Sequence, residues 1–321
     1  MSGTIRLGVV MDPIAAIKVH KDSSFAMLLA AQGRGWTLRH IEPDALWARD
    51  GEAWARMTPI EVRDDPEDWF TLGEAQDAPL SVLDIVLMRK DPPFDADFLY
   101  LTQILQLAQK QGVLVANRPE SLATANEKLF AQHFPDLCPP TLVTRERARL
   151  RAFLAEQGEI VVKPLDAMGG ASVFRIQSND PNLNVILETM TALDTRLVMA
   201  QRFLPAVSEG DRRILLIDGE PIEYALARIP REGEFRANLA VGGRGVASLL
   251  TAREREICTQ VGPVLRDMGL HFVGLDVIGG YLTEINVTSP TCIRELDAAH
   301  GLDIAGRLLD ALLAHRRKMS R

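Results

Sequence analysis

Three oxygen-bearing side chains, Asp276, Glu284 and Asn286, lie close together near the end of the 321-residue chain. Glu284 and Asn286 fall in one apolar run, residues 281–287, and are two positions apart, so on a β-strand both would point to one face. Two carboxylates and an amide oxygen suit Mg²⁺, a hard cation that takes oxygen ligands and shares them with phosphates. The alternative is an edge hairpin with solvated acids.

The register of this hairpin decides whether Asp276 joins the other two donors. A two-residue turn at Gly279-Gly280 would pair Asp276 with Thr283 and place it on the face opposite Glu284. A three-residue turn that also includes Tyr281 would place Asp276 directly across from Glu284. We expect the three-residue turn, because it gathers all three donors.

Two lysines and a glycine-containing loop lie upstream and could bind phosphates. Lys163 closes the apolar run 160–162, where a point charge can meet a phosphate, and Lys128 lies in an Asn-Glu-Lys-Leu-Phe run. Gly169 and Gly170 would let backbone N–H groups approach an anion. The loop is neither a Walker P-loop nor a dinucleotide-binding Gly-x-Gly-x-x-Gly. Taken singly, the lysines could simply reach solvent and the glycines could form an ordinary turn.

Arginines recur through the later part of the chain. Beside a metal–phosphate site they could gather anionic groups, although such a run is normally a solvated face. Arg89 closes another buried run, 82–88, and the carboxyl ends of strands in open α/β sheets border the ligand crevice. The later arginines are Arg212, Arg213, Arg228, Arg231, Arg236 and Arg244.

Cysteines and histidines predict little chemistry. The cysteines, Cys138, Cys258 and Cys292, form neither a disulfide framework nor a zinc knuckle. The six histidines are isolated in the chain and form no ligand pair. We interpret Cys292 as a packed or pocket-lining thiol, since no histidine can be assigned as its base.

Composition limits the class of protein. With 47% hydrophobic residues, the chain is long enough for two or three domains. A net charge of −7 argues against nucleic acid or an anionic membrane as the main partner. The first apolar run, residues 5–11, does not resemble a signal peptide, and no run approaches the roughly 18 apolar residues of a membrane span. We expect a soluble, cytoplasmic protein.

The order of the predicted elements changes along the chain. The first third alternates strands and helices, which predicts an open, mainly parallel sheet. Later strands are short and separated by turns such as Asp218-Gly219, which predicts antiparallel pairing with helices attached. Residues 230–247 are polar and glycine-rich, as in functional or mobile loops. Predicted strands are 5–11, 36–41, 82–88, 113–116, one near 142, 160–164, 172–176, 197–200, 212–217 and 223–229; predicted helices are 22–33, 95–111, 119–134 and 150–157.

In this order the motifs resemble those of the ATP-grasp superfamily. The motifs are Lys128, the run 163–170, the linker 199–205 and the hairpin from Asp276 to Asn286. Further runs resemble the bacterial glutathione synthetase family in particular and extend over almost the whole chain. These runs are residues 8–14, 21–28, 88–95, 126–129 and 283–295.

The resemblance implies an ATP-grasp fold that combines α/β and α+β architecture. An N-terminal substrate domain, residues 1–120, would carry the open sheet. A central lid subdomain, 121–203, and a C-terminal catalytic subdomain, 204–321, would hold ATP between two antiparallel sheets. The family's mobile lid would correspond to residues 230–245.

The resemblance also implies roles for individual residues. ATP would contact Lys128, Lys163, Gly169, Gly170, Gln201, Phe203 and Leu204, with the adenine held near 201–204. The metal, Mg²⁺ or Mn²⁺, would bind Asp276, Glu284 and Asn286. Substrates would contact Ser23, Arg89, Arg228, Ser289 and Thr291, and the reacting groups would meet Arg213, Arg236 and Asn238. Two departures from the family pattern, Ala167 and Gly280, remove none of these ligands.

The activity implied is the ATP-dependent joining of glycine to the cysteinyl carboxylate of γ-glutamylcysteine through an acyl phosphate, in a homo-oligomer that is often a tetramer. One alternative is another ATP-grasp ligase, of the D-alanine–D-alanine ligase or amino-acid ligase type. Another is a nucleotide-binding regulator on a degenerate ligase scaffold, although such proteins often lose metal ligands.

Overall fold

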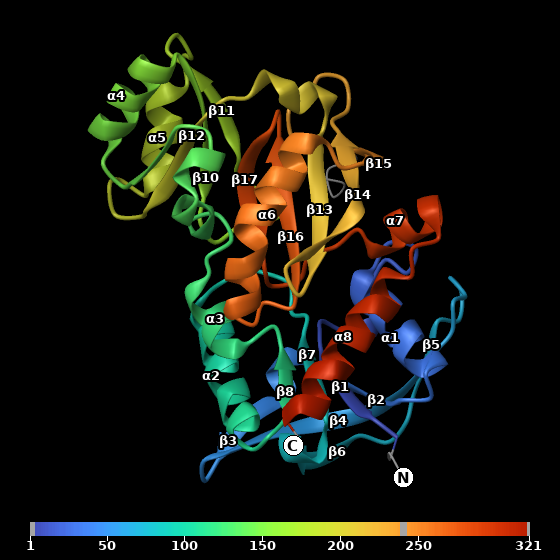
Figure 1. The fold of residues 1–321 in the computed structure, drawn as a ribbon. Coiled ribbons are helices and arrows are strands. Elements are labelled where there is room, and N and C mark those ends of the chain that lie inside the picture. Colours follow the sequence, from blue (N-terminus) through green and yellow to red (C-terminus); the bar gives the residue numbers. More distant parts are fainter. Residues whose placement is uncertain (1–3, 238–242, 320–321) are drawn as a thin grey trace.

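The computed structural model describes residues 4–237 and 243–319, which form three β-sheets with helices packed against them (Figure 1). The first sheet has a parallel centre in the order β2-β1-β7-β8, as its uninterrupted apolar runs predict. These strands are β1 (Arg6–Val10), β2 (Thr37–Ile41), β7 (Ile85–Met88) and β8 (Leu114–Ala116).

An antiparallel extension of this sheet was not predicted. Its longest strand alternates buried and exposed positions, but the buried positions include the small residues Ala53 and Ala55, so the apolar pattern is weak. The extension comprises β3 (Leu46–Arg49), β4 (Glu52–Val62), β5 (Phe70–Leu72) and β6 (Gln76–Pro79).

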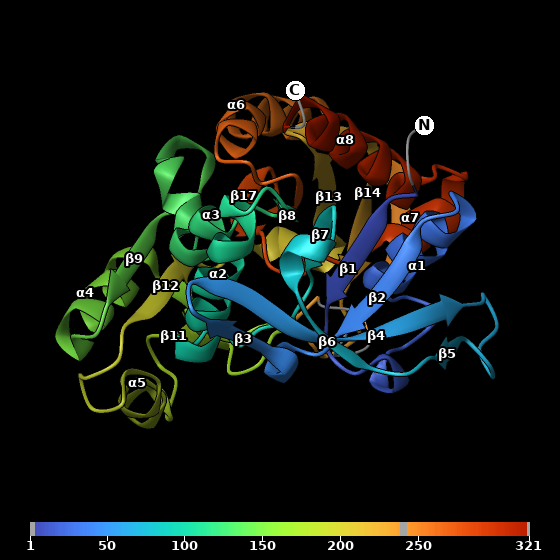
Figure 2. The same cartoon turned by 90° about the horizontal axis from the view of Figure 1, so that it is seen from below.

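Helices cover both faces of the first sheet. Helix α1 (Ser23–Gly33) begins where the Asp22 carboxylate accepts a hydrogen bond from the Phe25 N–H at 2.7 Å, and α2 (Ala96–Lys110) begins in the same way at Asp95. Because Val9 and Val10 point to opposite faces, the sheet packs α1 on one side and α2 on the other (Figure 2).

The predicted helix over residues 119–134 is wrong. Helix α3 (Pro119–Thr124) ends early, and a 3₁₀ turn follows at Phe130–His133. Between them the Asn126 side chain accepts hydrogen bonds from the backbone N–H groups of Lys128 and Leu129, at 3.2 and 3.0 Å. Such side-chain bonds offer the backbone an alternative to the helix. Other 3₁₀ turns are Ile14–Ala16, Pro43–Ala45, Leu80–Val82, Pro135–Leu137 and Pro205–Glu209.

The second sheet is antiparallel, in the order β11-β10-β12-β9, and helices α4 (Arg147–Gln157) and α5 (Leu183–Thr191) pack on it through a core of their own. It forms the green and yellow lobe in Figure 1. The strands are β9 (Thr141–Thr144), β10 (Glu159–Pro164), β11 (Phe174–Gln177) and β12 (Val198–Arg202).

The third sheet is also antiparallel, in the order β15-β14-β13-β16-β17. Strand β15 (Arg244–Leu249) begins inside the segment 230–247 that was predicted to be a loop, so that prediction fails at its C-terminal end. The other strands are β13 (Asp211–Ile217), β14 (Glu220–Ile229), β16 (Phe272–Ile278) and β17 (Tyr281–Asn286).

The C-terminal helices return to the first sheet. Helix α6 (Ala252–Asp267) covers the third sheet, whereas α8 (Ile304–Met319) packs against α1, with α7 (Ile293–His300) beside it. The strands of the first, second and third sheets lie within residues 1–120, 121–203 and 204–321, respectively. Helix α8 belongs to the last range in sequence but packs against α1 of the first range. No helix among the described residues is long and apolar enough to cross a membrane.

Candidate active site

The hairpin of β16 and β17 places Asp276 directly across from Glu284, which is the pairing predicted. The predicted three-residue turn, however, is wrong. Ile278 pairs with Tyr281, so the turn contains only Gly279 and Gly280.

A bulge on β17 restores the register. The two turn glycines have φ of +56° and +79°, which suits a tight two-residue hairpin turn. The pairing then skips Thr283, whose hydroxyl donates a hydrogen bond to the Asp276 carbonyl at 3.1 Å. The extra residue on β17 therefore shifts the strand register by one position, which is the shift that a third turn residue was expected to produce.

Buried arginines neutralise Asp276. The Arg213 guanidinium donates to both carboxylate oxygens, at 2.5 and 3.0 Å, and Arg228 approaches at 2.9 Å. Arg228 also pairs with Asp211 at 2.6 Å. The sheet register explains both pairs, because Arg213 lies opposite Asp276 and Asp211 lies opposite Arg228.

The two aspartates respond differently to this network. Burial alone would raise the pKa of Asp276, but the charges of Arg213 and Arg228 outweigh it and lower the pKa. Burial raises the pKa of Asp211 to about 7, and the Asp276 charge adds to the rise against the opposing effect of Arg228. The Asp211 Oδ1 is buried without a hydrogen-bond partner among the described residues.

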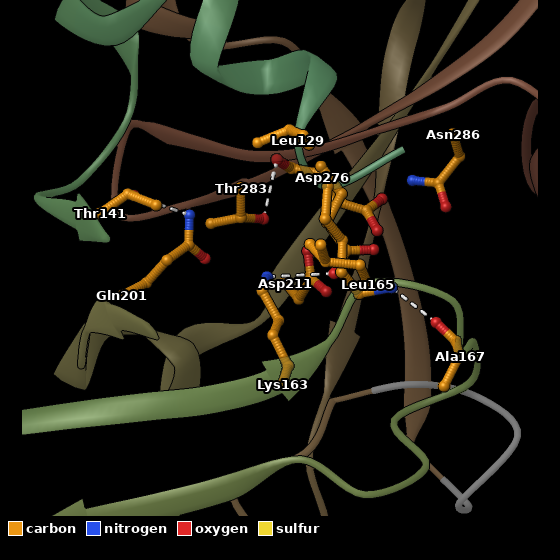
Figure 3. Close-up of polar contacts among 12 residues, drawn as sticks. Leu129, Thr141, Lys163, Leu165, Ala167, Gln201, Asp211, Asp276, Thr283 and Asn286 are labelled. Carbon is orange, nitrogen blue, oxygen red and sulfur yellow. Dashed lines mark hydrogen bonds and ion pairs between the residues drawn. The ribbon is translucent and has the colours of Figure 1, made fainter. Parts of the chain in front are cut away.

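Two lysines from different segments act on Glu284 through their charges, and Figure 3 shows Lys163 beside the hairpin. Lys163 Nζ lies 3.1 Å from Glu284 Oε1, and Lys128 Nζ donates to the Ala167 carbonyl at 2.5 Å. Burial would raise the pKa of Glu284, but the charges of Lys163 and Lys128 lower it. The site therefore keeps an ionised carboxylate between two buried cations.

A narrow pocket between the second and third sheets holds the predicted adenine residues. The Gln201 side chain donates to Thr141 Oγ1 at 3.1 Å. The Phe203 N–H already donates to the Glu159 carbonyl at 3.0 Å, which makes the Leu204 N–H the better candidate donor to a base. The pocket is lined by Lys128, Lys163, Gly169, Gly170, Gln201, Phe203, Leu204, Arg236, Asp276 and Glu284, among others.

The glycine loop contacts the start of the predicted lid. Gly169 and Gly170 have φ of +65° and +80°, and the Arg236 guanidinium donates to the Gly170 carbonyl at 3.3 Å. Arg236 also pairs with Glu234 at 2.6 Å and lowers the pKa of that carboxyl to about 2. Asn238, the other lid residue proposed, lies outside the described residues.

A second cavity adjoins the first and extends to the N-terminal domain. Its volume of about 380 Å³ lies within the range of small-molecule sites. Its predicted members are Ser23, Arg89, Arg213, Arg228, Asn286, Ser289 and Thr291, and both cavities share Lys128, Gly169, Asp276 and Glu284. Every described residue to which the resemblance gave a role therefore lines one of two joined cavities, whereas the candidate arginines Arg212, Arg231 and Arg244 line neither.

Arg89 is rigidly held in this cavity. It donates to Ser24 Oγ at 3.0 Å and to the Pro290 carbonyl at 2.9 Å, and burial lowers its pKa to about 10. Ser23 Oγ accepts a hydrogen bond from the Ile293 N–H at 3.2 Å. A buried guanidinium still charged at neutral pH is well suited to bind a substrate carboxylate.

Two charged side chains that line the cavities were not among the residues predicted from the sequence. Glu127 accepts hydrogen bonds through Oε1 from the N–H groups of Val287 and Thr288, at 2.8 and 2.9 Å, and so positions the chain next to Asn286. Glu127 directly precedes Lys128 in the sequence, and this position was the one feature from which it could have been predicted. Asp211 gave no signal, because its role depends on lying opposite Arg228 in the sheet.

The donor set fits a divalent cation. The side chains of Asp276, Glu284 and Asn286 project from one face of the hairpin. The Asn286 Nδ2 donates to the Gly274 carbonyl at 3.3 Å, so its Oδ1 remains available as a metal ligand. A carboxylate has about four lone-pair positions, so Asp276 can hold its arginines and a metal together. The edge hairpin with solvated acids does not describe this site, since Asp276 is only 3% exposed.

We expect the three cysteines to resist alkylation in the native protein. All are buried, and burial raises the pKa of Cys138 to about 11 and that of Cys258 to about 12, and also raises that of Cys292. A pKa of 11 leaves a thiolate fraction of about 0.1% at pH 8. Iodoacetamide labelling followed by mass spectrometry should modify the thiols quickly only after denaturation; fast native labelling of Cys292 would contradict its interpretation as a packed thiol.

Comparison with known proteins agrees with this geometry. Family models for prokaryotic glutathione synthetase match its N-terminal domain at residues 5–123 and its ATP-grasp domain at residues 127–301. A glutathione synthetase of Pseudomonas putida is 60% identical over 309 residues, covering 96% of this chain and 98% of the relative. One of Escherichia coli is 54% identical over 310 residues, covering 97% and 98%.

A solved structure shares the fold. The ATP-grasp ligase PsnB, complexed with a minimal precursor, Mg and ADP, has a TM-score of 0.60 at 20% identity and covers 97% of this chain and 98% of that one. The close relatives and the two family models, which together span most of the sequence, decide the assignment. The chain belongs to the prokaryotic glutathione synthetase family of ATP-grasp ligases.

Proposed function

We propose that the protein joins glycine to the cysteinyl carboxylate of γ-glutamylcysteine, consuming ATP and releasing glutathione, ADP and phosphate. The observation that carries the proposal is the junction of two cavities at Asp276 and Glu284. One cavity lies between the antiparallel sheets and suits a nucleotide, and the other reaches Arg89 and suits an anionic peptide. The relatives that cover nearly the whole chain are themselves named glutathione synthetases.

In the first step, a carboxylate oxygen of γ-glutamylcysteine attacks the γ-phosphorus of ATP. The bond from that phosphorus to the β–γ bridging oxygen breaks, ADP leaves and an acyl phosphate forms. Phosphoryl transfer depends mainly on positioning and charge neutralisation. Lys128 and Lys163 supply buried positive charge, while Arg213, fixed by Asp276, faces the cavity shared with the peptide.

In the second step, the free amine of glycine attacks the acyl carbonyl carbon. The tetrahedral intermediate then expels phosphate, and the nitrogen gives its one extra proton to the departing phosphate as the amide forms. Arg236 is placed to stabilise the oxyanion, because it extends from the lid to the glycine loop at Gly170. No protein nucleophile is required.

ATP-grasp ligases use ATP with a divalent metal, and we propose Mg²⁺ here, with Mn²⁺ as a substitute. Asp276, Glu284 and Asn286 would hold it. When bound, the ion would neutralise phosphate charge and orient the γ-phosphoryl group. PsnB was solved with Mg and ADP, which supports this choice.

The most direct test supplies γ-glutamylcysteine, glycine, ATP and Mg²⁺ to the purified protein and detects glutathione by mass. A substrate panel scored by ADP release then separates glutathione synthesis from other ATP-grasp ligations. Stimulation by pairs of D-alanine, with none by γ-glutamylcysteine plus glycine, would reject the proposal. Absence of any ADP release with every pair would favour the nucleotide-binding regulator.

We expect Arg236→Ala to uncouple ATP hydrolysis from peptide formation. Loss of the Gly170 contact would open the lid to water, so the acyl phosphate would hydrolyse before glycine attacks. Glutathione formation should fall by about 100–1,000-fold, as for the loss of one oxyanion donor, while ADP release falls less. The ratio of ADP to glutathione is the readout. Arg231→Ala, a change at an exposed position in the same segment, is the matched control; an unchanged ratio in Arg236→Ala would refute the lid role.

For assembly and location, we propose a cytoplasmic homo-oligomer, with a tetramer as the first candidate. The family resemblance supports the oligomer, and small-molecule substrates require neither nucleic acid nor a membrane. Sedimentation velocity at assay concentrations would test the assembly, and a single monomer peak would reject it.

A further inference from the structure

A second cluster of metal-ligating side chains lies outside the two active-site cavities. It contains Asp218, His271 and His315, whose candidate ligand atoms all lie within 4.8 Å of one another. His271 Nδ1 is 2.6 Å from Asp218 Oδ1, and His315 Nε2 is 2.8 Å from Asp218 Oδ2. The isolated positions of these histidines in the sequence predicted no ligand pair, so the fold alone creates the cluster.

The three residues come from segments that the fold holds firmly. Asp218 has φ of +50° in the two-residue turn between β13 and β14, and its N–H donates to the His271 carbonyl at 2.9 Å. A Cβ at the next position, Gly219, would lie 2.2 Å from the Gly262 carbonyl oxygen, so the turn cannot shift easily. His271 directly precedes β16, and His315 lies on α8.

Each imidazole turns one nitrogen towards the same carboxylate, so the candidate ligand atoms of the three residues face one small region. The side chains of Asp218, His271 and His315 are 24%, 11% and 33% exposed, so the cluster is shielded but retains an open side. The neighbouring Arg266 donates to the Asp218 carbonyl at 2.7 Å and pairs with Glu220, which leaves the carboxylate oxygens to the histidines.

We propose that Asp218, His271 and His315 bind a divalent transition metal of the zinc class. Two imidazoles and a carboxylate suit Zn²⁺, Co²⁺ or Ni²⁺, whereas Mg²⁺ prefers an all-oxygen shell. Three protein ligands leave a fourth, tetrahedral position for water on the open side. A neutral imidazole carries one ring proton. When this proton sits on the nitrogen that faces away from Asp218, the other nitrogen is free to bind the metal, and the charge of the ring is unchanged.

The geometry needs little adjustment. Ligand atoms about 2.0–2.1 Å from a tetrahedral zinc are about 3.3 Å apart. The two nitrogen–oxygen separations, 2.6 and 2.8 Å, would therefore lengthen by about 0.7 and 0.5 Å as the ion replaces the hydrogen bonds. Rotation of the His315 side chain, which is the most exposed of the three, can supply this movement.

The ion would cross-link parts of the molecule that are distant in sequence. It would join the β13–β14 turn and the start of β16 to α8, which itself packs against α1 of the N-terminal domain (Figure 1). A ligand that binds only the folded protein stabilises it. The site is independent of the proposed ligase reaction, because none of its three residues lines either active-site cavity.

The test titrates Co²⁺ into full-length protein that has been stripped with chelator and then saturated with Mg²⁺ and ADP. Visible absorption of tetrahedral Co²⁺ should saturate at one equivalent and disappear when Zn²⁺ is added. His315→Ala and Asp218→Asn should each weaken binding at least about tenfold. Asn-Gly also favours this turn, so Asp218→Asn keeps the hairpin. Zn²⁺ should raise the thermal midpoint of the parent protein but not of these variants.

Two controls make the result decisive. His300→Ala changes a histidine at the end of the neighbouring helix α7, and Glu284→Gln changes the proposed Mg²⁺ site; both should keep the Co²⁺ spectrum. If Co²⁺ does not bind, or binds equally well to Asp218→Asn and His315→Ala, the cluster is only a hydrogen-bonded contact and the proposal fails. Loss of binding in Glu284→Gln alone would assign the ion to the active site and also overturn it.

Discussion

Replacing Glu284 with glutamine should lower the kcat of glutathione formation at least about 100-fold. Metal-ion catalysis contributes several kcal/mol of charge stabilisation, and each 1.36 kcal/mol corresponds to a factor of ten in rate. Glutamine keeps the length of the side chain and one oxygen but removes the charge that faces Lys163 at 3.1 Å. Because Lys163 also loses its charged partner, near-ultraviolet circular dichroism of the variant must show a native spectrum before the loss is assigned to the chemical step.

The dependence on Mg²⁺ separates a metal ligand from a structural residue. In Glu284→Gln, the Mg²⁺ concentration for half-maximal rate should rise at fixed ATP, because a neutral amide is a weaker ligand than a carboxylate. Glu223→Gln is the matched control, since it makes the same chemical change at an exposed position of the same sheet. A Glu284→Gln enzyme with normal kcat and normal Mg²⁺ dependence would remove Glu284 from the metal site.

The elements predicted well from sequence were those with strong local signals. The central strands of the first sheet are short apolar runs buried on both faces, and α1 and α2 begin at aspartate caps. The antiparallel extension was missed because the buried face of β4 includes small alanines. The helix over 119–134 failed because one side chain, Asn126, competed for its backbone N–H groups.

The composition of the site was predictable, but its electrostatics were not. The candidate residues could be named because family motifs record them in order along the chain. Their charge pairs depend on register between strands distant in sequence: Arg213 meets Asp276 across β13 and β16, and Asp211 meets Arg228 across β13 and β14. Local spacing carries no information on such pairs. The correct pairing of Asp276 with Glu284 likewise arose from a bulge rather than from the expected turn.

Replacing Arg228 with methionine should lower the free energy of unfolding by about 3–5 kcal/mol, the usual cost of removing one partner from a buried ion pair. Arg228 is fully enclosed and lies 2.6 Å from Asp211 and 2.9 Å from Asp276. Asp276 keeps Arg213, whereas Asp211 would lose the partner of its only hydrogen-bonded oxygen. Urea unfolding at pH 7, followed by near-ultraviolet circular dichroism, would measure the change.

A second substitution tests whether the cost arises from the Asp211 carboxyl group, which is left without its arginine. Asp211→Asn in the Arg228→Met background replaces that buried carboxyl group with an amide, so the double variant should be more stable than the sum of the two single changes predicts. Contacting charged residues commonly couple by about 0.5–3 kcal/mol in such cycles. Arg175→Met is the control: its pair with Glu159 is 40% exposed on the arginine side, and its loss should cost about 1 kcal/mol or less. Strictly additive effects of Arg228→Met and Asp211→Asn would mean that the Arg228 side chain stabilises the sheet by packing, and that the charge network exists for binding phosphates rather than for folding.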